Sequence, residues 1–248
     1  MSQLTPGIEA VLASVAVACA ALAARSVVWL SPAHLRRWLP WMQSGAAGLL
    51  LGDALLHMLP AALYSGLSPA RLGQGIAAGA LGLLAIECVV RAIDTRSATA
   101  TFAKMNVIGD VFHHFVDGVV IGASFVVSPA LGMIVSMAIL AHELPREAGN
   151  AAVLVAGGYT PSKAFSLSLA TTLAIPAGAL SMTVAAHTPS FIGTSLALAA
   201  GTTLYLAMGD VIPGIWVHIG ARTRLLPIIG VGAGTLFMWL ATAVEHRV

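Results

Sequence analysis

The sequence predicts an all-α polytopic membrane protein with eight transmembrane helices. Hydrophobic residues make up 58% of its 248 residues and charged residues only 9%, whereas a soluble domain carries about 25% charge. The mean hydropathy is +0.91, and long apolar segments follow one another along the chain. Because each span needs about 20 apolar residues, we expect eight spans with short loops in a single transmembrane domain over residues 1–248.

Turn-forming residues separate the apolar segments and indicate where helices begin. Five joints pair Ser or Thr with Pro, a pattern that starts a turn or a helix: Ser31-Pro32, Ser68-Pro69, Ser128-Pro129, Thr160-Pro161 and Thr188-Pro189. The expected spans, each long enough to cross a bilayer, cover about 8–30, 39–64, 72–93, 101–127, 130–157, 162–186, 190–217 and 225–245.

The positions of the basic residues predict the orientation of these spans. The first, third, fifth and seventh loops hold nine of the twelve Lys and Arg residues: Arg25, Arg36, Arg37, Arg91, Arg96, Lys104, Lys163, Arg222 and Arg224. Positive residues concentrate in the cytoplasmic loops of membrane proteins. We therefore expect these loops in the cytoplasm and both termini outside, which agrees with an even number of spans.

The fourth expected span carries polar residues that lipid disfavours. In the segment DVFHHFVDGVVIGASF, the residues Asp110, His113, His114 and Asp117 lie at positions i, i+3, i+4 and i+7. A helix places all four on a single face. The apolar residues around them put this face within the depth of the bilayer.

The fifth expected span repeats this feature in the segment AHELPREAGN. His142 and Glu143 are followed one turn later by Arg146 and Glu147. A charged residue in the bilayer costs about 2.5–3.5 kcal/mol on insertion scales, so four or five together cost roughly 10 kcal/mol. Another group must compensate for this cost.

A divalent cation is the simplest compensation for carboxylates and imidazoles that converge from two spans. Asp, Glu and neutral His are ligands of zinc and of harder first-row metals. Such a mixed set suits Zn²⁺, and also Fe²⁺, Mn²⁺ or Cd²⁺, as a transported ion, and we expect no prosthetic group. The alternative is that these side chains satisfy one another by hydrogen bonds between helices.

The second and seventh spans carry further acids that suggest an ion pathway. GDALLHMLP places Asp53 and His57 at i and i+4 before Pro60, and LYLAMGDVIP places Asp210 before Pro213. The shared Gly-Asp and Pro pattern is typical of broken helices in two related halves of a transporter. We expect Asp53, His57 and the fourth-span Asp110 to pass ions into or out of the site, with Asp210 a weaker candidate and helix packing the alternative role for each.

A few other residues are expected to be structural. Glu87 lies one turn before Arg91 and is interpreted as its ion-pair partner. Cys19 and Cys88 lie in apolar stretches and are expected to act as small core residues. Pro145 has no amide hydrogen to donate, so the fifth helix should bend or loosen there.

Two motifs resemble those of a known family. HHFVDG at residues 113–118 resembles the His-Asn-Phe-x-Asp-Gly motif in the fourth span of the ZIP (Zrt/Irt-like) metal transporters, and HELPRE at residues 142–147 resembles the His-Glu-x-Pro-His-Glu motif of their fifth span. The segments of spans two and seven also look like the family. The resemblance implies a transporter, not an enzyme, that moves divalent metal toward the cytoplasm by shifting one group of helices against another.

The resemblance also implies the ligands of a metal site between spans four and five. His113, Asp117 and His142 match one metal position. Family members often hold a second metal bridged by carboxylates, for which His114, Asp117 and Glu143 occupy the matching places. His114 stands where the family usually has Asn, which retains a ligand.

Arg146 is the second departure from the family pattern, because it replaces the second His of the fifth-span motif. A guanidinium stays protonated and cannot ligate a metal. One hypothesis is that Arg146 supplies a fixed positive charge in place of one metal ion and leaves a site for a single mobile cation. The other is that Arg146 turns away to pair with Glu147 or Asp110, and both metals still bind.

Two other functions fit parts of the sequence. HELPR begins like the HExxH motif of a zinc metalloprotease, but Arg146 occupies the place of the second His ligand. A non-transporting membrane scaffold or sensor would use the polar cluster only to fix helix packing. We further expect the lipid bilayer and divalent ions as partners and no nucleic acid, leave a homodimer open, and place the chain, by analogy, in a bacterial inner membrane.

Overall fold

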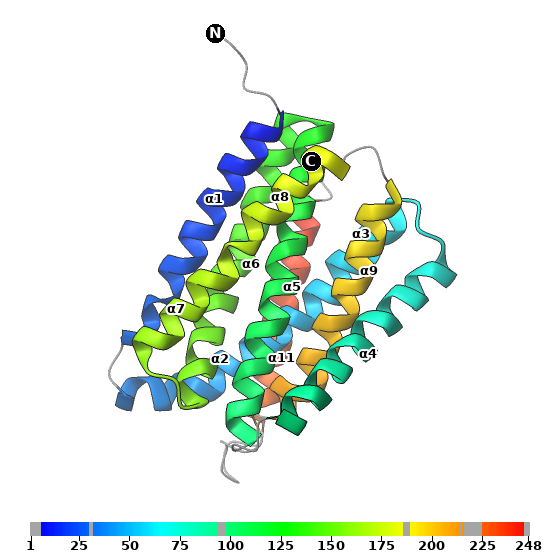
Figure 1. The fold of residues 1–248 in the computed structure, drawn as a ribbon. Coiled ribbons are helices and arrows are strands. Elements are labelled where there is room, and N and C mark those ends of the chain that lie inside the picture. Colours follow the sequence, from blue (N-terminus) through cyan, green and yellow to red (C-terminus); the bar gives the residue numbers. More distant parts are fainter. Residues whose placement is uncertain are drawn as a thin grey trace.

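The computed structural model describes residues 6–29, 32–93, 98–185, 189–213, 215 and 225–245, and every regular element in this part of the chain is helical. Figure 1 shows the helices side by side in an elongated bundle. The order of elements is α1 (Pro6–Ala24), η1 (Arg25–Trp29), α2 (Pro32–Gly52), η2 (Asp53–Met58), α3 (Leu59–Tyr64), α4 (Pro69–Ile93), α5 (Ala98–Val127), α6 (Pro129–Ala156), α7 (Pro161–Thr172), α8 (Ala174–Ala185), α9 (Pro189–Tyr205), η3 (Leu206–Val211) and α11 (Leu226–Glu245).

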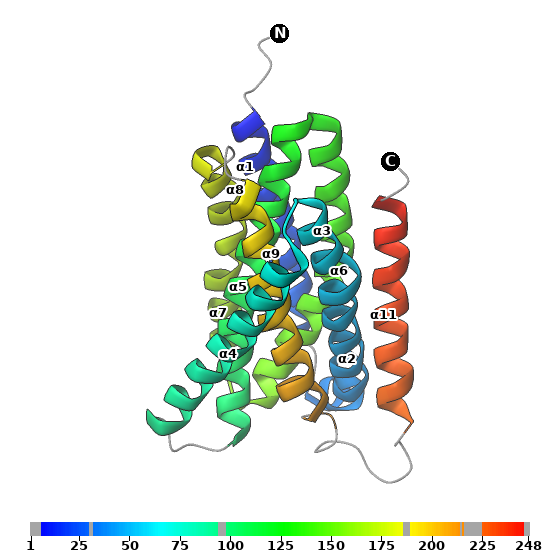
Figure 2. The same ribbon diagram turned by 90° about the vertical axis from the view of Figure 1, so that its right-hand side faces the viewer.

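Six segments of this bundle are long and apolar enough to cross a membrane. The two other expected spans correspond to α6, which contains Glu143, Arg146 and Glu147, and to α11. Helices cover the described residues of each expected span, although the expected span 162–186 forms two helices, α7 and α8, and residues 214 and 216–217 of the span 190–217 lie outside the described residues. The first turn of α1 and the last turn of α11 lie at the same end of the bundle (Figure 2), as an even number of crossings requires.

The helices pack in two groups. In one group α5 packs against α6 and α8, and α1 packs against α6 and α8; in the other α2 packs against α11, and α4 packs against α9. The groups meet mainly where α2 lies on α6 and α5 lies on α9. The polar faces of α5 and α6 therefore lie within one group and beside the other.

Glycine sets the close approach of α5 and α8. A Cβ added at Gly118 would overlap the carbonyl oxygen of Ile175, and one added at Gly178 would overlap the carbonyl oxygen of Phe115. Small residues allow backbones in membrane bundles to approach in this way. The close approach at Gly118 and Gly178 packs α5 tightly against α8.

Two segments are wound as π-helix, and both coincide with the Gly-Asp and Pro pattern. η2 begins at Asp53 just before Pro60, and η3 contains Asp210 just before Pro213. The structure thus widens the helix at these places where the sequence suggested a break. Single π-turns inside α-helices are frequent at functional sites.

Several structural expectations have clear outcomes. Arg91 donates from Nε to Glu87 Oε1 at 2.6 Å, so that ion pair is confirmed. The expectation of two core cysteines is wrong, because Cys19 and Cys88 are both exposed. In a membrane protein an apolar stretch also covers the outer surface that faces lipid, so hydrophobicity does not mark the interior. Around Pro145, α6 continues as one α-helix.

Candidate metal centre

The polar faces of α5 and α6 meet in the interior of the bundle. Asp110, His113, His114 and Asp117 of α5 are each 2% exposed or less, and so are Glu143, Arg146 and Glu147 of α6. On another side of α6, Gly149 allows α2 to approach closely, because a Cβ there would press on Ala46 of α2. The side chains form two groups with the spacing of metal ligands.

The first group, called here the His113 cluster, consists of His113, Asp117 and Glu143. His113 Nε2 lies 3.6 Å from Asp117 Oδ2 and 3.4 Å from Glu143 Oε1. Ligand atoms held about 2.0–2.1 Å from one ion in tetrahedral geometry lie about 3.3–3.4 Å apart. Asp117 Oδ2 has no hydrogen-bond donor among the described residues. The three ligand-type atoms lie close enough together to hold one cation.

Two residues of the π-helical segment η2 extend this cluster. Asp53 Oδ2 lies 3.6 Å from His113 Nδ1, and Asp53 Oδ1 lies 3.1 Å from His57 Nδ1. Asp53 and His57 are themselves buried. Both groups of helices therefore contribute side chains to one buried row of polar residues.

A cavity of about 370 Å³ reaches this row of buried polar residues at His57. His57 is among its lining residues, and Tyr64 at the end of α3 and Val127 at the end of α5 line it as well. Those ends lie at the end of the bundle where α1 begins (Figure 1). The cavity extends from that end of the bundle to His57. His57 contacts Asp53, and Asp53 in turn lies beside His113.

The second group, called here the Asp110 cluster, consists of Asp110, His114 and Glu147. His114 Nε2 lies 3.5 Å from Glu147 Oε1, and His114 Nδ1 lies 3.9 Å from Asp110 Oδ2. Unlike the His113 cluster, this group is filled with donors. Asn150 Nδ2 donates to Asp110 Oδ1 at 2.9 Å and to Glu147 Oε1 at 3.1 Å.

Arg146 lies between the two clusters. Its Nη1 donates to Asp110 Oδ1 at 2.6 Å, and its Nε donates to Glu143 Oε1 at 2.6 Å. Its Nη2 lies 3.3 Å from Glu147 Oε1. Glu143 also accepts through Oε2 at 3.0 Å from His114 Nε2, when that nitrogen carries the proton. Glu143 therefore belongs to both clusters.

Arg25 contacts the Asp110 cluster, although its place in the sequence predicted a cytoplasmic loop. That assignment is wrong, because Arg25 is 1% exposed and its guanidinium forms ion pairs with Asp110 and Glu147. It also donates to Ser168 Oγ of α7 at 2.5 Å. The sequence does contain one sign that Arg25 could be buried: it lies between an apolar run and the residues Ser-Val-Val-Trp, which are mainly apolar.

The charges of the two clusters do not balance. The described buried side chains of the two clusters and of η2 include five carboxylates, from Asp53, Asp110, Asp117, Glu143 and Glu147, and two guanidiniums, from Arg25 and Arg146. The guanidiniums lie at the Asp110 cluster, with one edge of Arg146 on Glu143. Among the described residues, Asp117 of the His113 cluster forms no ion pair with either guanidinium.

Two expected site residues fall outside the described side chains. His142 lies in α6 and Asp210 in η3, and only their backbone is described. The remaining expected residues are placed: His113, Asp117 and Glu143 come together, and His114 lies with Asp110 and Glu147.

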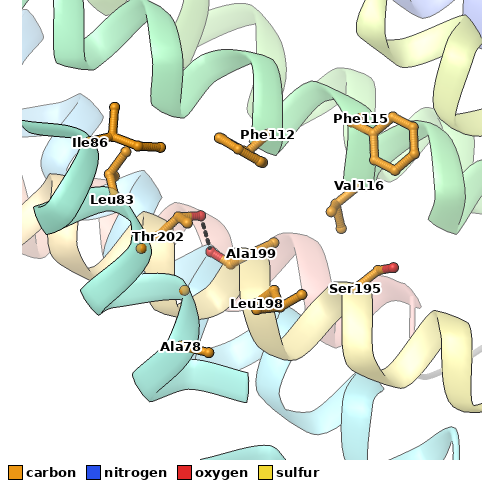
Figure 3. A pocket seen from close by; sticks show the side chains of 12 residues that line it. Ala78, Leu83, Ile86, Phe112, Phe115, Val116, Ser195, Leu198, Ala199 and Thr202 are labelled. Carbon is orange, nitrogen blue, oxygen red and sulfur yellow. Dashed lines mark hydrogen bonds between the residues drawn. The ribbon is translucent and has the colours of Figure 1, made fainter. Parts of the chain in front are cut away.

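A second cavity lies among α4, α5 and α9, and residues of all three helices line it (Figure 3). Its volume is about 300 Å³, and apolar side chains such as Leu83, Phe112 and Leu198 line it. The Thr202 hydroxyl in this cavity donates to the carbonyl of Ala199 at 2.9 Å. The cavity thus offers no cluster of metal ligands and forms an apolar seam between the two helix groups.

Comparison with known proteins gives consistent relatives. The orangutan (Pongo abelii) zinc transporter ZIP13 is 30% identical over 84% of this chain and 66% of its own length. Zinc transporter SLC39A7 of the dog (Canis lupus familiaris) is 33% identical over 57% of this chain and 32% of its own. Human (Homo sapiens) zinc transporter ZIP4 is 38% identical over 45% of this chain and 17% of its own.

The chain thus spans at most about two thirds of the length of these relatives. The sequence model of one protein family, described as ZIP zinc transporter, matches residues 92–242. This match includes α5, α6 and both ligand clusters, and it covers more than half of the chain. The chain therefore belongs to the ZIP zinc transporter family.

Proposed function

We propose that this membrane protein transports divalent transition-metal ions, with Zn²⁺ as the main substrate, through the His113 cluster. The observation that carries the proposal is a buried set of imidazole and carboxylate atoms spaced 3.4–3.6 Å apart, in which Asp117 Oδ2 has no donor among the described residues. The names of the relatives support zinc, because each is described as a zinc transporter.

The charge of the site supports a mobile cation rather than a purely structural cluster. Buried carboxylates are costly in a bilayer unless they are paired or bound to a cation. Arg25 and Arg146 compensate Asp110 and Glu147, but Asp117 has no Lys or Arg partner among the described ion pairs. A divalent ion at the His113 cluster would supply that charge.

The ligands that we propose are His113, Asp117 and Glu143, with His142 as a fourth from the same turn of α6. Three or four nitrogen and oxygen ligands suit Zn²⁺ and also bind Fe²⁺, Mn²⁺ or Cd²⁺, whereas an all-thiolate site would hold zinc too firmly for release. His114 contributes through Glu143, which it contacts at 3.0 Å.

The pathway that we propose begins at the cavity beside Tyr64 and Val127 and passes His57 and Asp53 to the His113 cluster. From there the ion moves toward Asp110. With eight spans and both termini outside, this direction is toward the cytoplasm. The apolar seam of Figure 3 gives the two helix groups a surface along which they can shift.

Arg146 supports binding of a single ion. Its guanidinium pairs with Asp110 and Glu147, which are the partners of the second hypothesis, but its Nε also donates to Glu143 of the His113 cluster, so its positive charge lies between the two sets of carboxylates. Substitution Arg146→His restores the family residue and removes this charge. We expect it to raise the number of metal ions bound per chain, and an unchanged number would contradict the single-ion proposal.

The alternatives have less support. Family membership indicates a transporter and not an enzyme, and the metalloprotease motif fails at Arg146. A scaffold or sensor would bind no metal and show no flux. The relatives reported above are animal proteins, so they do not support a bacterial inner membrane, and a homodimer also remains a prediction.

The decisive experiment is metal uptake into proteoliposomes with a panel of divalent ions. We expect saturable Zn²⁺ uptake that is lost, or reduced at least tenfold, in Asp117→Ala and His142→Ala. A matched control is Glu87→Gln, which changes a buried acid of α4 that belongs to neither cluster and whose partners include Arg91 and Tyr205. Equal uptake in the wild type and Asp117→Ala would refute the site.

A further inference from the structure

Arg25 fills the Asp110 cluster from outside the two helices that build it. Its guanidinium pairs with Asp110 of α5 and Glu147 of α6 and donates to Ser168 of α7. Asp110 Oδ2 also accepts from Thr171 Oγ1 at 3.0 Å. One side chain thus joins three helices and uses the carboxylates that a passing cation would need.

The two buried arginines are attached to the fold in different ways. Arg146 lies in the middle of α6, so its guanidinium can move only with that helix. Arg25 is the first residue of the short 3-10 helix η1, which follows the end of α1. Hydrogen-bond geometry in a 3-10 helix is poorer than in an α-helix. Arg25 can therefore leave its partners through a local change at the end of α1, while Arg146 cannot.

The Asp110 cluster stands between the His113 cluster and the far end of α5. Asp110 lies two turns from Asp117 toward the beginning of α5, and Asn106 follows one turn further. Asn106 is buried, and its Oδ1 has no hydrogen-bond donor among the described residues. A cation that leaves the His113 cluster in this direction meets the positive charge of Arg25 before it reaches Asn106.

We propose that Arg25 is a tethered counter-cation that closes the Asp110 cluster and exchanges there with the transported metal ion. The proposal rests on the transport function given above. In it, Arg25 keeps the path closed between the His113 cluster and Asn106 while no metal ion occupies the Asp110 cluster. Occupation of Asp110 and Glu147 alternates between the guanidinium and the ion. Negative charge at these carboxylates is therefore never left uncompensated in the bilayer.

The test counts metal ions bound to purified full-length protein at saturating Zn²⁺, by elemental analysis after removal of free ion. We expect one ion in the wild type, one in Arg25→Lys, which keeps the positive charge, and two in Arg25→Gln, which opens the Asp110 cluster. The double variant Arg25→Gln with Asp110→Asn removes a ligand together with the guanidinium and should return the count to one.

The outcomes separate the two proposals. A wild type that retains no ion would refute the transport site itself. One ion in both the wild type and folded Arg25→Gln would overturn only the role of Arg25 and leave it a structural residue.

A measurement on the wild type covers the case in which Arg25→Gln does not fold. Hydrogen–deuterium exchange of residues 25–29 should increase at least twofold when saturating Zn²⁺ is added, because the ion displaces the guanidinium and η1 loosens. Exchange that is unchanged or slower with Zn²⁺ would overturn the proposal. Exchange of α11, which has no residue in either cluster, serves as the internal control.

Discussion

Replacement of Arg146 by Gln should destabilise the protein, and metal should restore part of the loss. Arg146 holds Asp110 at 2.6 Å and Glu143 at 2.6 Å with all three side chains buried. Removing one partner of a buried ion pair costs about 3–5 kcal/mol, because the remaining charge stays desolvated. At about 2–4 °C per kcal/mol for a chain of this size, we expect Tm to fall by roughly 6–20 °C.

The metal-dependent part of this effect distinguishes charge compensation from simple packing. An ion present at 100 times its Kd stabilises the folded state by about 2.7 kcal/mol for each site. If Zn²⁺ takes the place of the guanidinium, Arg146→Gln gains a second site, and its Tm should rise with Zn²⁺ by about twice the rise in the wild type.

Thermal unfolding in detergent, followed by intrinsic fluorescence with and without Zn²⁺, measures both quantities. The matched control is Arg91→Gln, because Arg91 also pairs with an acid one turn away but its side chain is 50% exposed. Because solvent screens a pair with one exposed partner and Glu87 keeps its hydrogen bond from Tyr205, this variant should lower Tm less than Arg146→Gln does. Equal Zn²⁺-induced shifts in the wild type and Arg146→Gln would refute the reasoning.

Three further predictions follow from the same structure. Asp117→Asn should weaken Zn²⁺ retention at least tenfold, as equilibrium dialysis would show, because it replaces an anionic ligand; retention equal to that of the wild type would exclude Asp117 as a ligand. Gly118→Ala should reduce the amount of folded protein in a detergent size-exclusion assay, because its Cβ overlaps the Ile175 carbonyl, while Gly45→Ala, with open space around its Cβ, should behave as the wild type. Zn²⁺ uptake into proteoliposomes should weaken as the external pH falls, because protons compete with the metal for carboxylates and imidazoles; faster uptake in acid at unchanged metal affinity would contradict this competition.

The helices and the polar faces of α5 and α6 follow from local sequence. Long apolar runs require spans of fixed length, and the spacing of Asp110, His113, His114 and Asp117 places them together on any helix. The bounds of α5 and α6 are Ala98–Val127 and Pro129–Ala156, close to the expected 101–127 and 130–157. These features depend on periods of three to seven residues, which a sequence displays directly.

The contacts between distant segments were decided by the tertiary structure. Arg25 pairs with Asp110, 85 residues away, although its position at the end of an apolar run equally suits a loop. Asp53, in the π-helical segment η2, lies beside His113, 60 residues away, and Cys19 and Cys88 face outward because lipid accepts apolar surface as readily as the interior does. Hydropathy in a membrane protein thus predicts which segments are helical and buried in lipid, but the rotation and docking of each helix, which choose its partners, depend on packing against the others.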